Sequence, residues 1–155
     1  MSLQKLLEKR AFVSVATADL QGVPNAAPKF ILRADQKFIY LADYTGGKTW
    51  ENLRINPLVS ISLSDINELK GYKINGTVKI IIEGPIHKEL TQTFEERKIA
   101  LSVERVINGV QKQKTHKDFE VGIPVDFAVF QVKIEEITEI NPQGETQRKA
   151  VPRQM

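Results

Sequence analysis

The sequence predicts a mainly β fold, an antiparallel β-barrel with added helices. In the middle of the chain apolar and polar residues alternate, which is typical of strands with one buried and one solvated face. Val59, Ile61 and Leu63 alternate with serines, and a second alternating run extends from Tyr72 to Ile82. The longer spacing of amphipathic helices is confined to segments between the strands. A length of 155 residues suits one domain with an ordinary hydrophobic core.

The first half of the chain predicts one short helix, three strands and a second short helix. Leucines recur at helical spacing in the opening helix, and strands follow where β-branched and aromatic residues lie between turn residues. The second helix begins near Lys48 and ends at Asn56-Pro57, because proline disfavours helical geometry in the residue before it. The expected elements before it are helix 3–10, strand 12–17, turn 19–22, strand 24–32, turn 33–36 and strand 37–42.

The second half adds the two alternating strands, a long helix and a closing strand. Gly84-Pro85 ends the second alternating strand, and residues 90–110 resume helical periodicity with apolar residues among charged ones. Residues 127–139 supply the closing strand, and a polar loop precedes it. The sequence therefore predicts a single domain at 1–140, with a helical insertion at about 88–121 and a disordered tail at 141–155.

The composition limits the possible chemistry and partners. Zero cysteines exclude disulfides, thiolate metal sites and cysteine nucleophiles, and agree with a reducing cytoplasm. No apolar run approaches the roughly 20 residues needed to cross a bilayer, so we expect a soluble protein that does not contact membranes. The formal charge is +3, but the tail 141–155 contributes +2 of it, so the folded body lacks the basic face of a nucleic-acid binder.

A glycine pair between a strand and a helix forms the most informative motif. Gly46-Gly47-Lys48-Thr49 brings free backbone N–H groups, a lysine and a hydroxyl to the first turn of the helix. Such an arrangement binds phosphate, so the motif predicts a phosphorylated small ligand. Its last residues also match a nucleotide-binding P-loop, but Ala42 stands where that motif needs glycine, and a P-loop requires a parallel sheet. The P-loop is therefore the less favoured alternative.

The remaining chemistry-bearing residues form no catalytic or metal-binding motif. His87 and His116 stand without carboxylates at a metal-binding spacing, so we expect no metal site and favour surface or hydrogen-bonded roles for both. The serines of the alternating strand do not occupy a nucleophile elbow, and the sequence identifies no catalytic residue. Trp50 is expected to be a packing or interface aromatic.

Several short segments follow one another in a recognisable order. They are Phe12 to Thr17, Gly22-Val23-Pro24-Asn25, Pro28-Lys29-Phe30, Ala42-Asp43-Tyr44, Lys48-Thr49 and Asn56-Pro57-Leu58-Val59-Ser60. In this order they resemble the FMN-binding split-barrel proteins related to pyridoxamine 5′-phosphate oxidase. The likeness covers about 5–85, and residues 127–137 fit the closing strand of that family.

This resemblance implies an antiparallel split β-barrel of the FMN-binding type and a homodimer with FMN at the subunit interface. The contacts that it implies lie around the FMN phosphate, beside the flavin ring, and at the edge of the ring or ribityl chain. They are Lys48 and Thr49 at the phosphate, Pro28, Lys29 and Phe30 beside the ring, Asp43 and Tyr44 at the ring or ribityl edge, and Asn52, which lies four residues after Lys48 on the same helix face.

The chain also departs from the pattern of true pyridoxamine phosphate oxidases. Those enzymes carry an arginine on the second strand and a lysine five residues later, where this chain has Ala27 and Leu32, and their basic C-terminal motif is not recognisable in 137–155. The chain is more similar to the branch of small FMN-binding proteins, flavin reductases and flavoredoxin-like proteins, in which some relatives use deazaflavin or haem. The resemblance thus implies an FMN-dependent oxidoreductase with a small-molecule redox substrate. A non-enzymatic FMN-binding electron carrier is the alternative.

Overall fold

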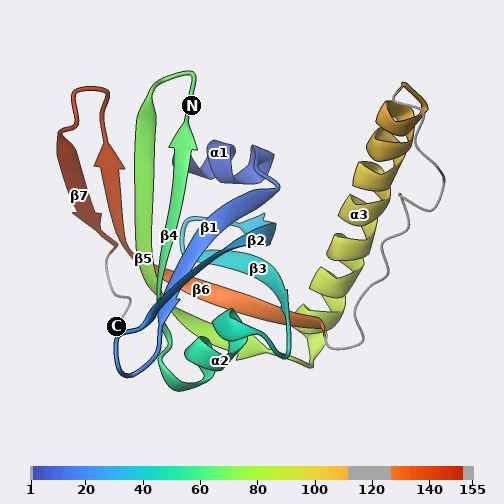
Figure 1. Ribbon diagram of the computed structural model, residues 1–155, viewed down its shortest axis with the longest axis horizontal. Helices are drawn as coiled ribbons and strands as arrows, with labels where there is room; N and C mark the ends of the chain where they lie inside the picture. The colour runs from blue at the N-terminus through green and yellow to red at the C-terminus, as the bar shows by residue number, and fades with distance from the viewer. Residues whose placement is uncertain (1, 112–126, 152–155) are drawn as a thin grey trace.

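Six antiparallel strands close into a barrel (Figure 1). The computed structural model describes residues 2–111 and 127–151, with side chains for all of these except 101–111. Neighbouring strands follow the order β3-β2-β1-β4-β5-β6, and β3 also pairs with β6, which closes the sheet. The barrel strands are β1 (Phe12–Ala18), β2 (Pro24–Ala34), β3 (Phe38–Tyr44), β4 (Leu58–Asp65), β5 (Lys70–Ile81) and β6 (Phe127–Ile140).

The antiparallel β-barrel predicted from the alternating strands is confirmed. All strand pairs in the described part of the chain are antiparallel. A P-loop stands between a strand and a helix of a parallel sheet, so the nucleotide P-loop alternative does not fit this fold. The glycine pair therefore belongs to a different kind of site.

The main hydrophobic core fills the interior of the barrel. Helices α1 (Leu3–Lys9) and α2 (Lys48–Ile55) lie toward opposite ends of the barrel (Figure 1) and contribute Leu7 and Leu53 to this core. Helix α2 ends before Asn56-Pro57, as predicted. The interior residues with no exposed surface are Val15, Ile31, Ile39, Leu41, Ile61, Ile74, Phe130 and Val132.

A second apolar cluster lies on the outside of the barrel, under helix α3 (Pro85–Gln111). Leu90 and Phe94 of α3 join outward-facing residues of β2, β3 and β6 there. The helix begins five residues earlier than predicted, because Gly84 adopts a positive φ of 99° and proline is favoured at a first helical position. Farther along, α3 runs away from the barrel (Figure 1). The predicted polar loop, with the end of the 88–121 insertion, lies outside the described residues.

Two arginines tie α3 to the barrel. The register of β2 against β3 shifts between Ile31 and Arg33, and Arg33 lies toward α3, where it pairs with Glu89 at 2.9 Å. The same guanidinium lies 4.7 Å from the ring centre of Tyr40. Arg97 donates a hydrogen bond to the backbone oxygen of Ile31. None of the described helices is long and apolar enough to cross a membrane.

The prediction of a disordered tail is wrong for residues 146–150. These residues form β7 (Thr146–Ala150), which pairs with β6, and Val151 continues the contact by donating its N–H to the oxygen of Glu135. All five residues of β7 are exposed, so backbone hydrogen bonds hold this strand, and the sequence carries no apolar alternation to reveal it. The turn before it depends on Gly144, whose φ is 83°. Residues 152–155 lie outside the described part of the chain.

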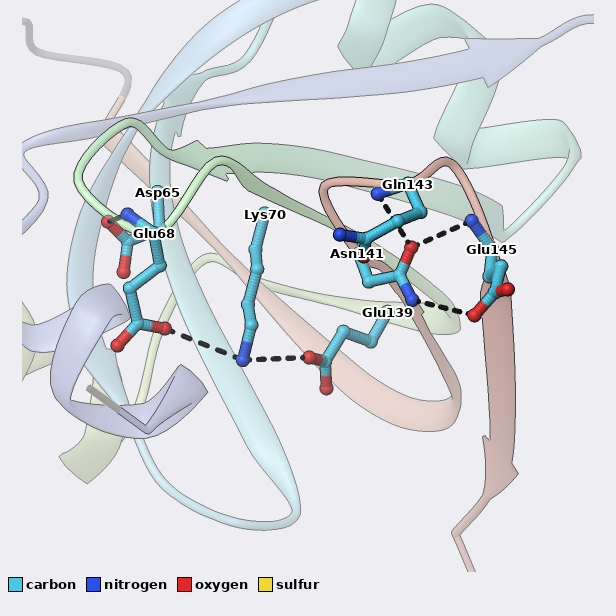
Figure 2. A network of polar contacts seen from close by, with 7 residues as sticks. All are labelled: Asp65, Glu68, Lys70, Glu139, Asn141, Gln143 and Glu145. Carbon is cyan, nitrogen blue, oxygen red and sulfur yellow. Dashed lines mark hydrogen bonds and ion pairs between the residues drawn. The ribbon is translucent and has the colours of Figure 1, made fainter.

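A network of polar contacts joins the tips of the β4–β5 and β6–β7 hairpins (Figure 2). Lys70 bridges Glu68 at 3.5 Å and Glu139 at 3.2 Å, and Asn141 holds the second turn by accepting the N–H of Glu145 at 2.8 Å. The hydrogen bond and charge of Glu139 raise the pKa of Lys70. Burial raises the pKa of the neighbouring Tyr72 above its ordinary 10.0, with a smaller contribution from Glu139.

Replacing Gly76 by alanine should destabilise the barrel. A Cβ at this position would collide with the backbone oxygen of Lys133 on β6, and backbone cannot move aside as a flexible side chain can. We expect Gly76→Ala to lower the free energy of unfolding by about 2–3 kcal/mol in urea denaturation. The matched control is Gly71→Ala on the same strand, where the nearest atoms would lie at 3.7 Å and a change of at most about 0.5 kcal/mol is expected. Equal effects of the two substitutions would contradict the register of β5 against β6.

The raised pKa of Tyr72 predicts a loss of stability at alkaline pH. Because the folded protein keeps the phenol proton above the ordinary pKa of 10.0, the unfolded chain ionises first as the pH rises, and the free energy of unfolding falls. Urea denaturation between about pH 9 and about pH 11 should show a smaller fall in the free energy of unfolding for Tyr72→Phe than for the wild type. Lys70 acts in the same direction in both proteins, so it does not account for the difference. Parallel curves would show that Tyr72 is not buried as described.

Candidate functional site

The loop between β3 and α2 presents an open helix N-terminus. Gly46 and Gly47 adopt positive φ values of 123° and 88°, which glycine tolerates far better than other residues. Gly47 is the N-cap, and no side chain in the described part of the chain caps the helix. The first hydrogen bond within the helix runs from the N–H of Glu51 to the oxygen of Gly47, at 3.0 Å. The N–H groups of residues 48–50 precede it and are the donors that a helix start leaves available.

Lys48 adds a positive charge beside these donors. Its side chain is half exposed, and its ammonium lies 3.9 Å from the carboxylate of Glu51, which is exposed as well. An exposed pair at this separation contributes little to stability, so the ammonium can turn to another anion at small cost. The loop therefore combines backbone donors, the positive end of a helix dipole and one available cation.

A layer of polar side chains lies between α2 and the end of the barrel. Thr49 and Asn52 are each only 2% exposed, although both belong to the short helix α2. Asn52 donates through Nδ2 to Oγ1 of Thr17 on β1 at 3.1 Å, and Asn25 on β2 donates to Oγ1 of Thr49 at 3.3 Å. Lys48 and Asn52 were expected to face the same way, but one is exposed and the other is buried. The first turns of α2 are thus held to two strands by side-chain hydrogen bonds.

Lys29 and Asp43 form an ion pair in the same region. Their side chains lie 3.0 Å apart between Nζ and Oδ2 and are 16% and 4% exposed. Lys29 pairs in register with Val13, a residue of the interior core, and Asp43 stands two residues after the interior residue Leu41. Both charged side chains therefore lie on the inner face of the barrel wall, where an unpaired charge would be costly.

Of the implied ring contacts, Pro28 and Tyr44 are exposed on the outer face of the sheet. Phe30 is 8% exposed, because Phe12 and Phe94 each pack edge-on against it with ring centres 5.4 Å away. Phe12 itself is 55% exposed. A ligand on this face would meet Pro28, Tyr44 and Phe12, whereas Phe30 would support the surface from beneath.

The structure divides the eight implied contact residues into an exposed and an internal group. The exposed group consists of Pro28 and Tyr44 on the outer face of the sheet and Lys48 at the start of α2. The internal group has little exposed surface and consists of Phe30, which is covered on the outer face by Phe12 and Phe94, and of Lys29, Asp43, Thr49 and Asn52, which contact other parts of the barrel. Direct contact of any of these residues with a cofactor stays a prediction.

Sequence reasoning missed Thr17 and Asn25 as part of this region. Thr17 occupies the inward position after Val13 and Val15 on β1, so its place in the alternation could have marked a polar residue at the end of the core.

Trp50 packs against the interior cluster, with Arg54 5.8 Å from its ring centre. His87 bonds through Nε2 to the oxygen of Phe127 at 2.9 Å, and His116 lies outside the described residues. Within residues 2–111 and 127–151 no cluster of acidic or histidine side chains could hold a metal ion.

Comparison with known proteins identifies the family of this barrel. A family model described as pyridoxamine 5′-phosphate oxidase matches residues 2–141. The crystal structure of HupZ from Group A Streptococcus has a TM-score of 0.65 and 26% identity, over 89% of this chain and 91% of that one. A pyridoxamine 5′-phosphate oxidase-related, FMN binding protein from Nostoc punctiforme has a TM-score of 0.56 and 14% identity, over 97% and 92% of the two chains. No curated protein matches this chain.

Other structures with the same fold are described with different cofactors. An F420 reductase has a TM-score of 0.60 and 16% identity, over 88% of this chain and 96% of that one. A heme binding protein from Mycobacterium smegmatis has a TM-score of 0.62 and 14% identity, over 95% of this chain and 55% of that one. At these identities the likeness establishes the fold alone.

Breaking the Lys29–Asp43 pair should cost far more stability than breaking an exposed pair. Lys29→Met would leave the Asp43 carboxylate buried without a cation, so we expect the free energy of unfolding to fall by about 3–5 kcal/mol. The matched control is Arg33→Met on the same strand, whose partner Glu89 lies at the similar distance of 2.9 Å but is exposed. Its expected cost in urea denaturation is about 1 kcal/mol or less. A small effect of Lys29→Met would mean that Asp43 does not depend on Lys29.

Proposed function

We propose that this chain, which belongs to the pyridoxamine 5′-phosphate oxidase family, is an FMN-binding flavoprotein and an FMN-dependent oxidoreductase. The observation that carries this proposal is the open N-terminus of α2 beside Lys48, at the position where the family resemblance puts the FMN phosphate. Bound FMN would supply the electron chemistry, and the protein would bind and orient it. We place the protein in the cytoplasm, which agrees with a chain without cysteines.

The start of α2 fits a terminal phosphate. A dianion there can accept hydrogen bonds from the free N–H groups of residues 48–50 and gains about 0.3–1 kcal/mol from the helix dipole. The ammonium of Lys48 adds a charge-assisted hydrogen bond. A Cβ on either Gly46 or Gly47 would meet no atom within 4 Å, so the approach to this loop is open. Thr49 contributes its backbone N–H, while its hydroxyl accepts from Asn25.

The exposed face beside this loop suits a second copy of the chain. Ser14 lies between Pro28 on β2 and Ser62 on β4 in register, and Ala16 lies between Ala26 and Ser60 in the next row. These side chains are small and uncharged, and loss of charge distinguishes the centre of interfaces from other protein surface. A homodimer formed through this face would cover Pro28 and enclose a flavin between the subunits.

Binding of FMN to the purified protein tests the proposal. We expect a yellow protein, or a stripped protein that binds added FMN, and we expect Lys48→Ala to weaken FMN binding by about tenfold because it removes a charge-assisted hydrogen bond. The binding constant can be measured from quenching of flavin fluorescence. Lys5→Ala on α1, an exposed lysine toward the other end of the barrel, is the matched control and should bind FMN as the wild type does.

The other outcomes of the FMN titration, and the reduction of bound FMN, decide between the alternative cofactors and between an enzyme and an electron carrier. A colourless protein that ignores FMN would overturn the proposal, and deazaflavin and haem would then be titrated as the alternative cofactors. For an FMN-binding protein, reduction by NADH or NADPH with turnover of an added small acceptor supports the oxidoreductase. Reduction by a protein donor alone supports the non-enzymatic electron carrier.

A further inference from the structure

The loop that starts α2 is fixed by buried polar contacts at both of its ends. We propose that the Lys29–Asp43 ion pair is a positioning pair, which acts through this loop to hold the phosphate-binding N–H groups in place. This inference rests on the proposed function, since it assigns a role within the same site. It gives Lys29 and Asp43 an indirect role, in place of the direct cofactor contacts that the resemblance implies.

Asp43 provides the anchor before the loop. It is the last inward-facing residue of β3, and its carboxylate is 4% exposed and lies 3.0 Å from the ammonium of Lys29 on β2. Tyr44 follows on the outer face, and Thr45 leads from it into the glycine pair. The ion pair thus adds a side-chain contact to the strand end from which the loop departs, where the backbone of Asp43 and Tyr44 also pairs with β6.

Thr49 and Asn52 provide the anchor after the loop. Thr49 accepts from Asn25 on β2 at 3.3 Å, and Asn52 donates to Thr17 on β1 at 3.1 Å. Lys29 and Asn25 belong to the same strand, so one strand holds both ends of the loop. Only residues 44–48 span the distance between the two anchors.

The glycines cannot fix this loop by themselves. Gly46 and Gly47 lose more conformational freedom on folding than other residues, and no atom would lie within 4 Å of a Cβ on either. No side chain of the glycines can therefore hold the loop by packing, and we infer that its conformation depends on the residues at its ends. Loosening one anchor should let the N–H groups lose the alignment that a phosphate needs.

An electrostatic role and a positioning role of Asp43 predict opposite changes in FMN affinity when Asp43 is replaced by asparagine. Asp43→Asn removes a negative charge near the proposed phosphate and leaves the Lys29 ammonium unpaired, so a purely electrostatic role predicts tighter binding of a dianion. A positioning role predicts weaker binding, because the side-chain contact that the ion pair adds at the strand end is lost. The sign of the change therefore separates the two roles.

The test compares FMN with riboflavin, which lacks the phosphate, by fluorescence titration of the full-length protein. We expect Asp43→Asn to weaken FMN binding by about tenfold and to change riboflavin binding by about twofold or less, since riboflavin has no phosphate to contact the N–H groups of the loop. Lys29→Met/Asp43→Leu removes both charges and leaves no unpaired buried charge, so it should fold even if Asp43→Asn is destabilised too far for titration. It should lose FMN affinity to the same extent as Asp43→Asn, because both variants lack the same pair.

Arg33→Met is the matched control, since it breaks an ion pair of the same strand on the opposite face of the sheet. It should leave the ratio of FMN to riboflavin affinity unchanged. The positioning role is wrong if the wild type binds FMN more tightly than riboflavin and both Asp43→Asn and Lys29→Met/Asp43→Leu keep that preference. It is also wrong if Asp43→Asn tightens FMN binding. In both cases the proposed function stands. If the wild type binds FMN no more tightly than riboflavin, the proposed phosphate site itself is wrong, and the inference fails with it.

Discussion

The pairing of β3 with β6 is the constraint on which the rest of the structure depends. Seven residues of β3 pair with β6, from Phe38 opposite Lys133 to Tyr44 opposite Phe127, and this ladder closes the sheet. Closure removes two open edges and fixes which side chains of β3 face the interior. It also fixes the point at which β3 ends, and therefore the position from which the glycine loop and α2 start.

Inward-facing and outward-facing residues alternate along β3, and at the end of the strand the two kinds of residue have different roles. Leu41 and Asp43 face inward, where the first completes the apolar core and the second pairs with Lys29. Tyr44 faces outward beside the small, uncharged side chains of β1 and β2. The inward residues hold the loop, and the outward residues form the surface that a ligand and a second subunit would meet.

Much of the fold could be predicted from sequence because its signals are local. Alternation revealed the strands, Asn56-Pro57 marked the end of α2, and the glycine pair marked its start. Strand β7 could not be found this way, because its exposed residues are held by backbone hydrogen bonds to β6. The Lys29–Asp43 pair also escaped prediction, since it depends on the register of two strands and on the inner face that each residue occupies. Resemblance to a family named residues near the site but could not distinguish those that face a ligand from those that support them.

The most direct test of this account is a crystal structure of the protein with FMN bound. The account predicts the phosphate against the backbone N–H groups of Lys48 and Thr49, within reach of the Lys48 ammonium, with Lys29 and Asp43 still paired inside the barrel. A phosphate bound away from the start of α2, or an Asp43 carboxylate turned outward to the ligand, would contradict it.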